Sequence, residues 1–219
     1  MNSAQTVPGY LALPSAGTGP GVLVLHAWWG LTDVIQDVCD RLAALGFVAY
    51  APDLYHGQLA TTIPEAERLG KELDQNADRA QAETRAAVDM LLAYTGDQSR
   101  GIGVVGFSLG AAYALQLSGA APEQVRAVVL FYGASGGDFA RAQATYLGHF
   151  AEDDPYEPAE SVAWLADALT SAGRSATFYR YDGVGHWFFE PDRVDAYNET
   201  AATLAWERTV AFLREQLSG

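Results

Sequence analysis

The stretch Ile102-Gly-Val-Val-Gly-Phe-Ser108-Leu-Gly-Ala-Ala-Tyr-Ala-Leu115 decides the fold. It begins with a short run of apolar residues and glycine, as in a buried strand of a parallel sheet, and the residues after Gly110 favour a helix. Between the two lies Gly-Phe-Ser-Leu-Gly, from Gly106 to Gly110, which matches the pattern G-x-S-x-G. In this pattern the serine occupies a tight, strained turn, and larger residues at the glycine positions would clash where strand and helix cross. The stretch therefore predicts a strand–turn–helix unit that exposes the hydroxyl of Ser108.

The same alternation of strand and helix extends in both directions from this unit. Short apolar runs bounded by glycine or turn residues predict strands, and longer stretches with helical spacing predict helices. The expected strands are residues 22–26, 47–52, 101–106, 125–132, 144–150 and 176–181. The expected helices are residues 32–45, 64–94 with a break near 75–76, 109–117, 157–171 and 196–217. Strands joined by helical crossovers predict an α/β fold, with a mostly parallel sheet and helices on both faces. No linker divides residues 1–219, so one domain is expected.

Composition excludes several classes of partner. The chain of 219 residues has 27 acidic and 13 basic side chains, and its formal net charge is −14. Because a chain this acidic repels phosphate backbones and anionic lipid, we expect no nucleic-acid or membrane partner. No run reaches the about 18 apolar residues of a membrane span, and no secretory signal is recognised, so a cytoplasmic location is expected. Cys39 is the only cysteine, which excludes an internal disulfide and fits a small buried hydrophobic residue.

A serine hydroxyl needs a neighbouring base to act as a nucleophile, and histidine is the usual choice. In the chain order that accompanies this kind of turn, an acid and then a histidine follow the serine. Of the four histidines, His149 and His186 follow Ser108. His149 falls within or at the end of an expected strand, whereas His186 lies in a glycine-rich loop after the last expected strand. We therefore predict His186 as the base; the alternative is a loop histidine that packs on Trp187.

The acid that orients this histidine should follow a strand between Ser108 and His186. Residues 151–158, Ala-Glu-Asp-Asp-Pro-Tyr-Glu-Pro, supply four carboxylates there. Asp154 directly precedes a proline, which holds the backbone extended and could fix the side chain. Asp154 is therefore the favoured acid and Asp153 the alternative. The neighbouring carboxylates are also typical of an acidic turn that opens a helix.

Acyl transfer at Ser108 would also need two N–H donors for the negative oxygen that develops during the reaction. One is expected to be the amide of Leu109, directly after the nucleophile. The other should come from the loop after residues 22–26, where Trp28 is favoured and Ala27 is the alternative. Aromatic side chains that follow expected strands are predicted to bind a small-molecule substrate: Trp29, Tyr55, His56, Trp187 and Phe188.

Six segments in this order resemble the dienelactone hydrolase family, from about Gly9 to the C-terminus. They are GYLALP at 9–14, VLHAWWGL at 24–31, APDLYHG at 51–57, GFSLG at 106–110, HFAEDDPYEP at 149–158 and GHWF at 185–188. The resemblance implies an α/β-hydrolase fold and hydrolysis of an ester or lactone, and we expect no cofactor and no metal ion. It supports Asp154 as the acid, because the family's acid is followed a few residues later by proline, here Pro158.

The sequence departs from the family's pattern at three places. The best-known members use cysteine where this chain has Ser108, and a glutamate that activates the thiol where this chain has Ala27. They also hold the substrate carboxylate with arginines, one of them a few residues past the histidine, where this chain has Phe188, Phe189 and Glu190. A glutamate there would repel an anionic lactone.

We therefore expect a serine hydrolase that cleaves a small, neutral ester or lactone through an acyl-enzyme. The alternatives are a thioesterase or carboxylesterase for medium acyl chains, and a non-catalytic, hydrolase-like binding protein. The sequence gives no indication of the oligomeric state.

Overall fold

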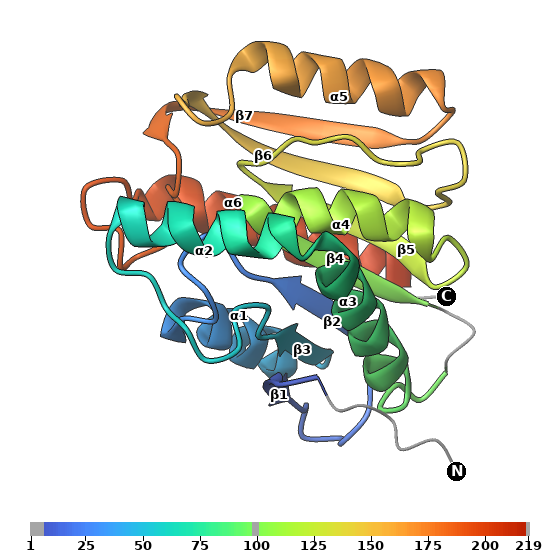
Figure 1. The fold of residues 1–219 in the computed structure, drawn as a ribbon. Coiled ribbons are helices and arrows are strands. Elements are labelled where there is room, and N and C mark those ends of the chain that lie inside the picture. Colours follow the sequence, from blue (N-terminus) through green and yellow to red (C-terminus); the bar gives the residue numbers. More distant parts are fainter. Residues whose placement is uncertain (1–6, 98–100, 218–219) are drawn as a thin grey trace.

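A computed structural model describes residues 7–97 and 101–217. Within these residues the strands form one seven-stranded sheet in the order β1-β3-β2-β4-β5-β6-β7 (Figure 1). The strands are β1 (Gly9–Ala12), β2 (Gly21–Leu25), β3 (Val48–Pro52), β4 (Ile102–Phe107), β5 (Val125–Phe131), β6 (Thr145–Asp153) and β7 (Ala176–Gly185). Neighbouring strands are parallel, except that β1 runs antiparallel to β3.

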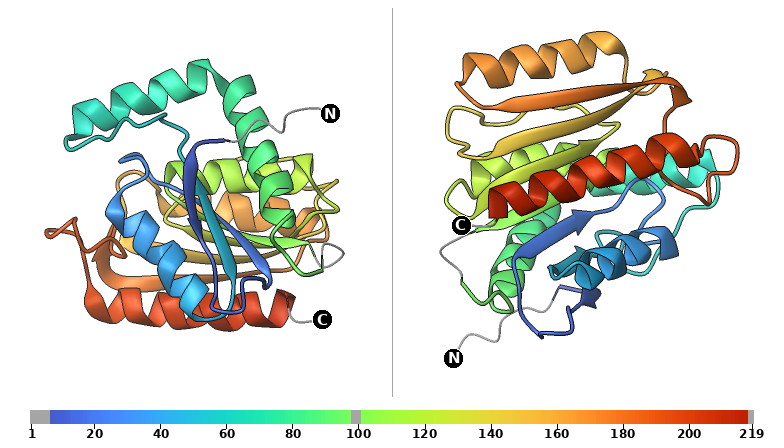
Figure 2. Two further views of the ribbon diagram at one scale, coloured as in Figure 1. Left: turned by 90° about the horizontal axis from the view of Figure 1, so that it is seen from below. Right: turned by 180° about the vertical axis from the view of Figure 1, so that it is seen from behind.

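Helices cover both faces of this sheet, as predicted. In Figure 2, α1 (Asp33–Ala44) and α6 (Glu199–Leu217) lie on one face. The other face carries α3 (Ala77–Leu92), α4 (Leu109–Ala120) and α5 (Ala159–Ser171), with α2 (Ile63–Gln75) beside α3. Because both faces are covered, β2, β3 and β4 are buried over their whole length, which explains why they are continuous apolar runs rather than alternating ones.

The predicted strands and helices agree with the structure, except that their end residues differ and that one edge strand of the sheet was not predicted. The expected break near residues 75–76 lies where α2 ends and α3 begins. β6 and β7 continue three and four residues further than expected, because they stay paired across an irregularity up to Asp153 and Gly185. β1 was not predicted: it has four residues at the sheet edge and is mostly exposed or half-buried, so it lacks the apolar run of an interior strand.

The parallel strands bring three distant segments of the chain together at the carboxyl ends of the strands. Ser108 follows β4, Asp154 follows β6, and His186 follows β7. Carboxyl ends of parallel strands are where ligands bind in sheets of this kind. None of the helices in the described part of the chain is long and apolar enough to span a membrane.

Candidate active site

The turn that carries Ser108 has the strain that its sequence predicts. Ser108 has φ 50° and ψ −111°, in a region that residues with a side chain rarely adopt. Its N–H donates to the carbonyl oxygen of Phe131 at 2.9 Å, which fixes the turn against β5. A Cβ atom on Gly106 would clash with the carbonyl oxygen of Gly110, and one on Gly110 would clash with that of Leu25. The prediction that both positions require glycine is therefore confirmed.

A line of hydrogen bonds joins the serine to a histidine and a carboxylate. Nε2 of His186 lies 2.9 Å from Oγ of Ser108, and Nδ1 of His186 lies 2.7 Å from Oδ2 of Asp154. Because a carboxylate accepts and does not donate, Nδ1–H is the donor, and Nε2 of the neutral ring is then free to accept from the serine hydroxyl. The side chains of His186 and Asp154 are 5% and 2% exposed, so water barely competes for this bond. The arrangement can move a proton from Ser108 to His186.

The loop after β6 orients the carboxylate of Asp154. Its other oxygen, Oδ1, accepts hydrogen bonds from the amides of Tyr156 at 2.9 Å and Glu157 at 3.0 Å. One oxygen is therefore held by the backbone while the other contacts His186. Asp153, the alternative acid, is the last residue of β6 and its side chain is exposed.

The predicted donors for a negative oxygen lie on the first turn of α4 and in the loop after β2. Leu109 is the first residue of α4, so its amide points out of the helix end without an intrahelical acceptor. The loop after β2 lies against the same helix end, because a Cβ on Gly110 would meet the carbonyl oxygens of both Leu25 and His26. In that loop Ala27 is fully buried, whereas Trp28 is half-buried and reaches the surface of the site. The amide of Trp28 therefore stays the predicted second donor, with that of Ala27 as the alternative.

Aromatic rings surround the imidazole of His186. The ring centroids of Tyr132, Tyr156 and Trp187 lie 4.9, 5.1 and 4.8 Å from that of His186. Tyr156 is 42% exposed and also contacts the rings of Trp28 and Trp187 at 5.7 and 5.0 Å. Together, Trp28, Tyr156 and Trp187 form an aromatic surface beside the nucleophile. Sequence reasoning missed Tyr156; the available signal was its position two residues after the predicted acid.

The other predicted substrate residues are distributed differently. Trp29 is buried against Trp187, with ring centroids 5.1 Å apart, and so supports the aromatic surface from beneath. Tyr55 is buried and packs on His26 at 4.8 Å. His56 is exposed, and its Nε2 lies 2.9 Å from a carboxylate oxygen of Glu83 on α3.

Phe188 corrects the predicted set of substrate-binding residues. It is fully buried and packs between Tyr132 and Tyr181, at centroid distances of 5.5 and 5.0 Å. A side chain with no exposed surface belongs to the hydrophobic core and does not line an open binding site.

Glu190 also differs from its expected place. It is 1% exposed, and the hydroxyl of Tyr132 donates to its Oε1 at 2.7 Å. Burial raises the pKa of Glu190 to about 8, although the hydrogen bond from Tyr132 opposes this shift. The carboxyl group is therefore mostly uncharged at neutral pH and does not face the substrate side. The expectation that it repels an anionic lactone is wrong, because a buried and mostly uncharged carboxyl group presents no charge to the substrate.

His149, the competing histidine, is part of the core. It is fully buried in β6, with Nδ1 2.9 Å from the hydroxyl of Tyr181 and Nε2 3.0 Å from that of Thr209. Burial lowers the pKa of His149 to about 3, so the ring is neutral. Both ring nitrogens have partners, and neither is available to Ser108.

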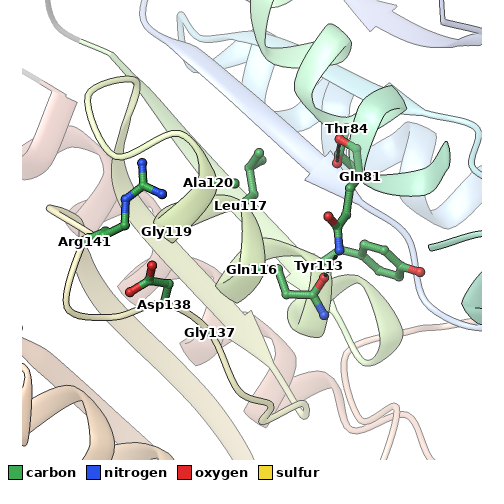
Figure 3. Close-up of a pocket in the computed structure, with 10 residues that line it drawn as sticks. All are labelled: Gln81, Thr84, Tyr113, Gln116, Leu117, Gly119, Ala120, Gly137, Asp138 and Arg141. Atoms are coloured by element: carbon green, nitrogen blue, oxygen red, sulfur yellow. Dashed lines mark hydrogen bonds between the residues drawn. The ribbon is translucent and has the colours of Figure 1, made fainter. Parts of the chain in front are cut away.

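The pocket drawn in Figure 3, about 350 Å³ in volume, lies towards the opposite end of α4 from Ser108. Its walls include Gln81 of α3 and Gln116 of α4, whose amides are hydrogen-bonded at 3.3 Å, and Arg141 from the segment before β6. It contains no pairing of a nucleophile with a base. Among the described residues, no group of three or more His, Cys, Asp or Glu side chains could hold a metal ion.

Comparisons with known proteins agree on one family. The dienelactone hydrolase family model matches residues 7–217. Protein usf of Aquifex pyrophilus is 35% identical, over 97% of this chain and 94% of the relative. A putative carboxymethylenebutenolidase of Aquifex aeolicus is 33% identical, over 96% and 94%. The crystal structure of a putative dienelactone hydrolase from Klebsiella pneumoniae superposes with a TM-score of 0.81 at 28% identity, covering 94% of this chain and 92% of that one.

Proposed function

The chain belongs to the dienelactone hydrolase family, and we propose that it is a serine hydrolase that cleaves a small carboxylic ester or lactone through an acyl-enzyme on Ser108. One observation carries the proposal. At the carboxyl ends of the strands, Nε2 of His186 lies 2.9 Å from Oγ of Ser108, and Nδ1 of His186 lies 2.7 Å from Oδ2 of Asp154. These are the distances at which a serine, a base and an orienting acid cooperate in acyl transfer.

In the first step, Oγ of Ser108 attacks the carbonyl carbon of the ester while its proton moves to Nε2 of His186. The new Oγ–C bond pushes the carbonyl electron pair onto oxygen, and the amides of Leu109 and Trp28 hold the resulting negative charge. The positive end of the α4 dipole lies at the same place and adds to this stabilisation. The tetrahedral intermediate then collapses: the bond to the leaving oxygen breaks, and that oxygen takes the proton from His186.

In the second step, water gives a proton to His186 and attacks the acyl-enzyme, and Ser108 leaves with that proton. With a lactone, the leaving oxygen stays attached to the acyl group, so one ring-opened product forms. Asp154 holds the imidazole in the tautomer with a proton on Nδ1 and stabilises the imidazolium in both steps. Because Oδ1 of Asp154 is fixed by two amides, the imidazole has little freedom to turn away.

The aromatic surface of Trp28, Tyr156 and Trp187 supports a flat, uncharged substrate. These rings stand beside His186 and present apolar faces, on which an aryl or unsaturated ring could stack. Asp154 is bonded directly to His186, and its negative charge beside the reacting groups favours a substrate without charge.

The test is activity-based labelling combined with hydrolysis. Wild-type protein is treated with a fluorophosphonate probe and its mass measured, and p-nitrophenyl acetate turnover is recorded. We expect one adduct on Ser108, and an about 10³-fold or greater loss of turnover in Ser108→Ala. Ser171→Ala, at an exposed serine at the end of α5, is the matched control and should keep full activity.

Full turnover in Ser108→Ala, or no adduct on the wild type, would refute the proposal and favour the non-catalytic alternative. Profiling p-nitrophenyl esters of two to twelve carbons, aryl esters, thioesters and neutral lactones then separates the substrate classes. A rate maximum at medium acyl chains or at thioesters would contradict the preference for small esters and lactones.

A further inference from the structure

Tyr132 and Glu190 form a buried hydrogen-bonded pair behind the imidazole of His186. Tyr132 directly follows β5, is fully buried, and holds a φ of 38°, which a residue with a side chain rarely adopts. Its ring lies 4.9 Å from that of His186, and its hydroxyl donates to Oε1 of Glu190 at 2.7 Å. Tyr156 contacts the same imidazole from the exposed side, at 5.1 Å. His186 is therefore in contact with one buried and one exposed tyrosine.

Both partners of this pair are tied to the segments that carry the reacting groups. The residue after Tyr132 is Gly133, where a Cβ atom would lie 2.6 Å from the carbonyl oxygen of Ser108, so this turn supports the nucleophile directly. Glu190 lies four residues after His186, and its N–H donates to the carbonyl oxygen of Trp187 at 2.9 Å. The bond between Tyr132 and Glu190 thus joins the turn beneath Ser108 to the loop that holds His186.

Charged groups near the pair act on its ionisation. Asp192 raises the pKa of Glu190, and Arg193 lowers it. Asp192, Asp154 and Glu190 itself all raise the pKa of Tyr132. Burial dominates and raises the pKa of Glu190 to about 8. An uncharged carboxyl group accepts the tyrosine hydroxyl without placing a net charge behind the imidazole. Ionisation would bring an unhydrated carboxylate into this site, which is costly unless water enters.

We propose that Glu190 is a positioning residue for His186, acting through Tyr132. The inference rests on the hydrolase function proposed above. In its uncharged form Glu190 holds the Tyr132 ring against the imidazole. When it ionises, water drawn to the carboxylate loosens that ring, and His186 is held less well for proton transfer.

The experiment measures kcat and KM for p-nitrophenyl acetate from pH 6 to pH 9.5, with Ser108→Ala as the blank for spontaneous hydrolysis. Glu190→Gln keeps the shape and the acceptor oxygen but cannot ionise, and Tyr132→Phe keeps the ring but removes the hydroxyl. Glu215→Gln, at an exposed carboxylate near the end of α6, is the matched control. Circular dichroism of each variant checks that it folds.

We expect wild-type kcat to fall on the alkaline side with an inflection near pH 8, and Glu190→Gln to lack this inflection while keeping kcat within about 3-fold at pH 7. Tyr132→Phe should lose about 10-fold in kcat with little change in KM, because a misplaced imidazole slows proton transfer without affecting substrate binding. The Glu215→Gln profile should superimpose on the wild type.

Two results would overturn the inference: identical pH profiles for wild type and Glu190→Gln, or full kcat in Tyr132→Phe. Either result would mean that Tyr132 and Glu190 only contribute to packing in the hydrophobic core. A failure of the proposed function is distinguishable, since the wild type would then show neither a probe adduct nor turnover above the Ser108→Ala blank. If Tyr132→Phe does not fold, Glu190→Gln alone still decides the question.

Discussion

Replacing Glu190 by glutamine should change how the stability of the protein depends on pH. The carboxyl group is 1% exposed, and its pKa in the folded protein is about 8, against an ordinary value of 4.5. Between these two values the folded protein keeps a proton that the unfolded chain has released. The free energy of unfolding therefore falls as the pH rises through this window. Below pH 4.5 the contribution is fully present, and above pH 8 it is fully lost.

The magnitude follows from the width of the window. Each pH unit between the two values costs about 1.4 kcal/mol of stability, so the wild type should lose about 3 kcal/mol from this group alone between pH 5.0 and pH 7.5. Glutamine cannot ionise, so the variant lacks this slope while keeping an acceptor oxygen for Tyr132. Other titrating groups contribute equally to both proteins and cancel in the difference.

Urea unfolding followed by tryptophan fluorescence at half-unit pH steps measures this difference directly. We expect the stability of Glu190→Gln relative to wild type to rise steadily from pH 5.0 to pH 7.5. The exposed-site variant Glu215→Gln should run parallel to the wild type. If Glu190→Gln also runs parallel to the wild type, the carboxyl group ionises in the folded protein at an ordinary pH, and the reasoning from its burial fails.

Three further predictions concern the site and its support. Asp154→Asn should lower kcat by about 10⁴-fold, because the imidazole would adopt the wrong tautomer, whereas Asp153→Asn should leave kcat within about 2-fold; equal losses would contradict the assignment. Gly110→Ala should abolish probe labelling and lower the free energy of unfolding by about 1–3 kcal/mol, since the added methyl clashes with the Leu25 carbonyl; an unchanged urea midpoint would argue against it. His149 is neutral in the folded protein and takes up a proton near pH 6.5 in the unfolded chain, so the free energy of unfolding should drop by about 1.4 kcal/mol per pH unit from pH 6 to pH 4. His149→Gln should flatten this slope, and an unchanged slope in urea titrations would refute the prediction.

The strongest sequence predictions are those that depend on neighbours in the chain. The turn at Ser108 is encoded within five residues, because the two glycines satisfy the steric demands of the crossing strand and helix. Chain order and the places of His186 and Asp154 after strands predict both residues, and the structure joins them to Ser108 through hydrogen bonds. Such features depend on local backbone geometry and on the rule that the carboxyl ends of parallel strands lie at the same end of the sheet.

Side-chain burial in the loop after His186 could not be predicted in the same way. Trp187 has a φ of 64°, and the side chains of Phe188 and Glu190 that follow it are buried. The partner that accommodates Glu190 is Tyr132, which lies 58 residues away in the chain. No local pattern indicates that distant hydroxyl, so the sequence alone predicts that this buried acid faces the substrate.

The loop after β6 combines several functions of the site in a short segment. Its first four residues, Asp154 to Glu157, include the carboxylate that orients His186, the two amides that fix it, and the exposed ring of Tyr156 beside the nucleophile. Insertions or deletions here would displace the acid together with the ring. Evolution or engineering of substrate range in this scaffold is therefore restricted to side-chain replacement at Tyr156, or to changes in neighbouring loops, and loop length is not free to vary.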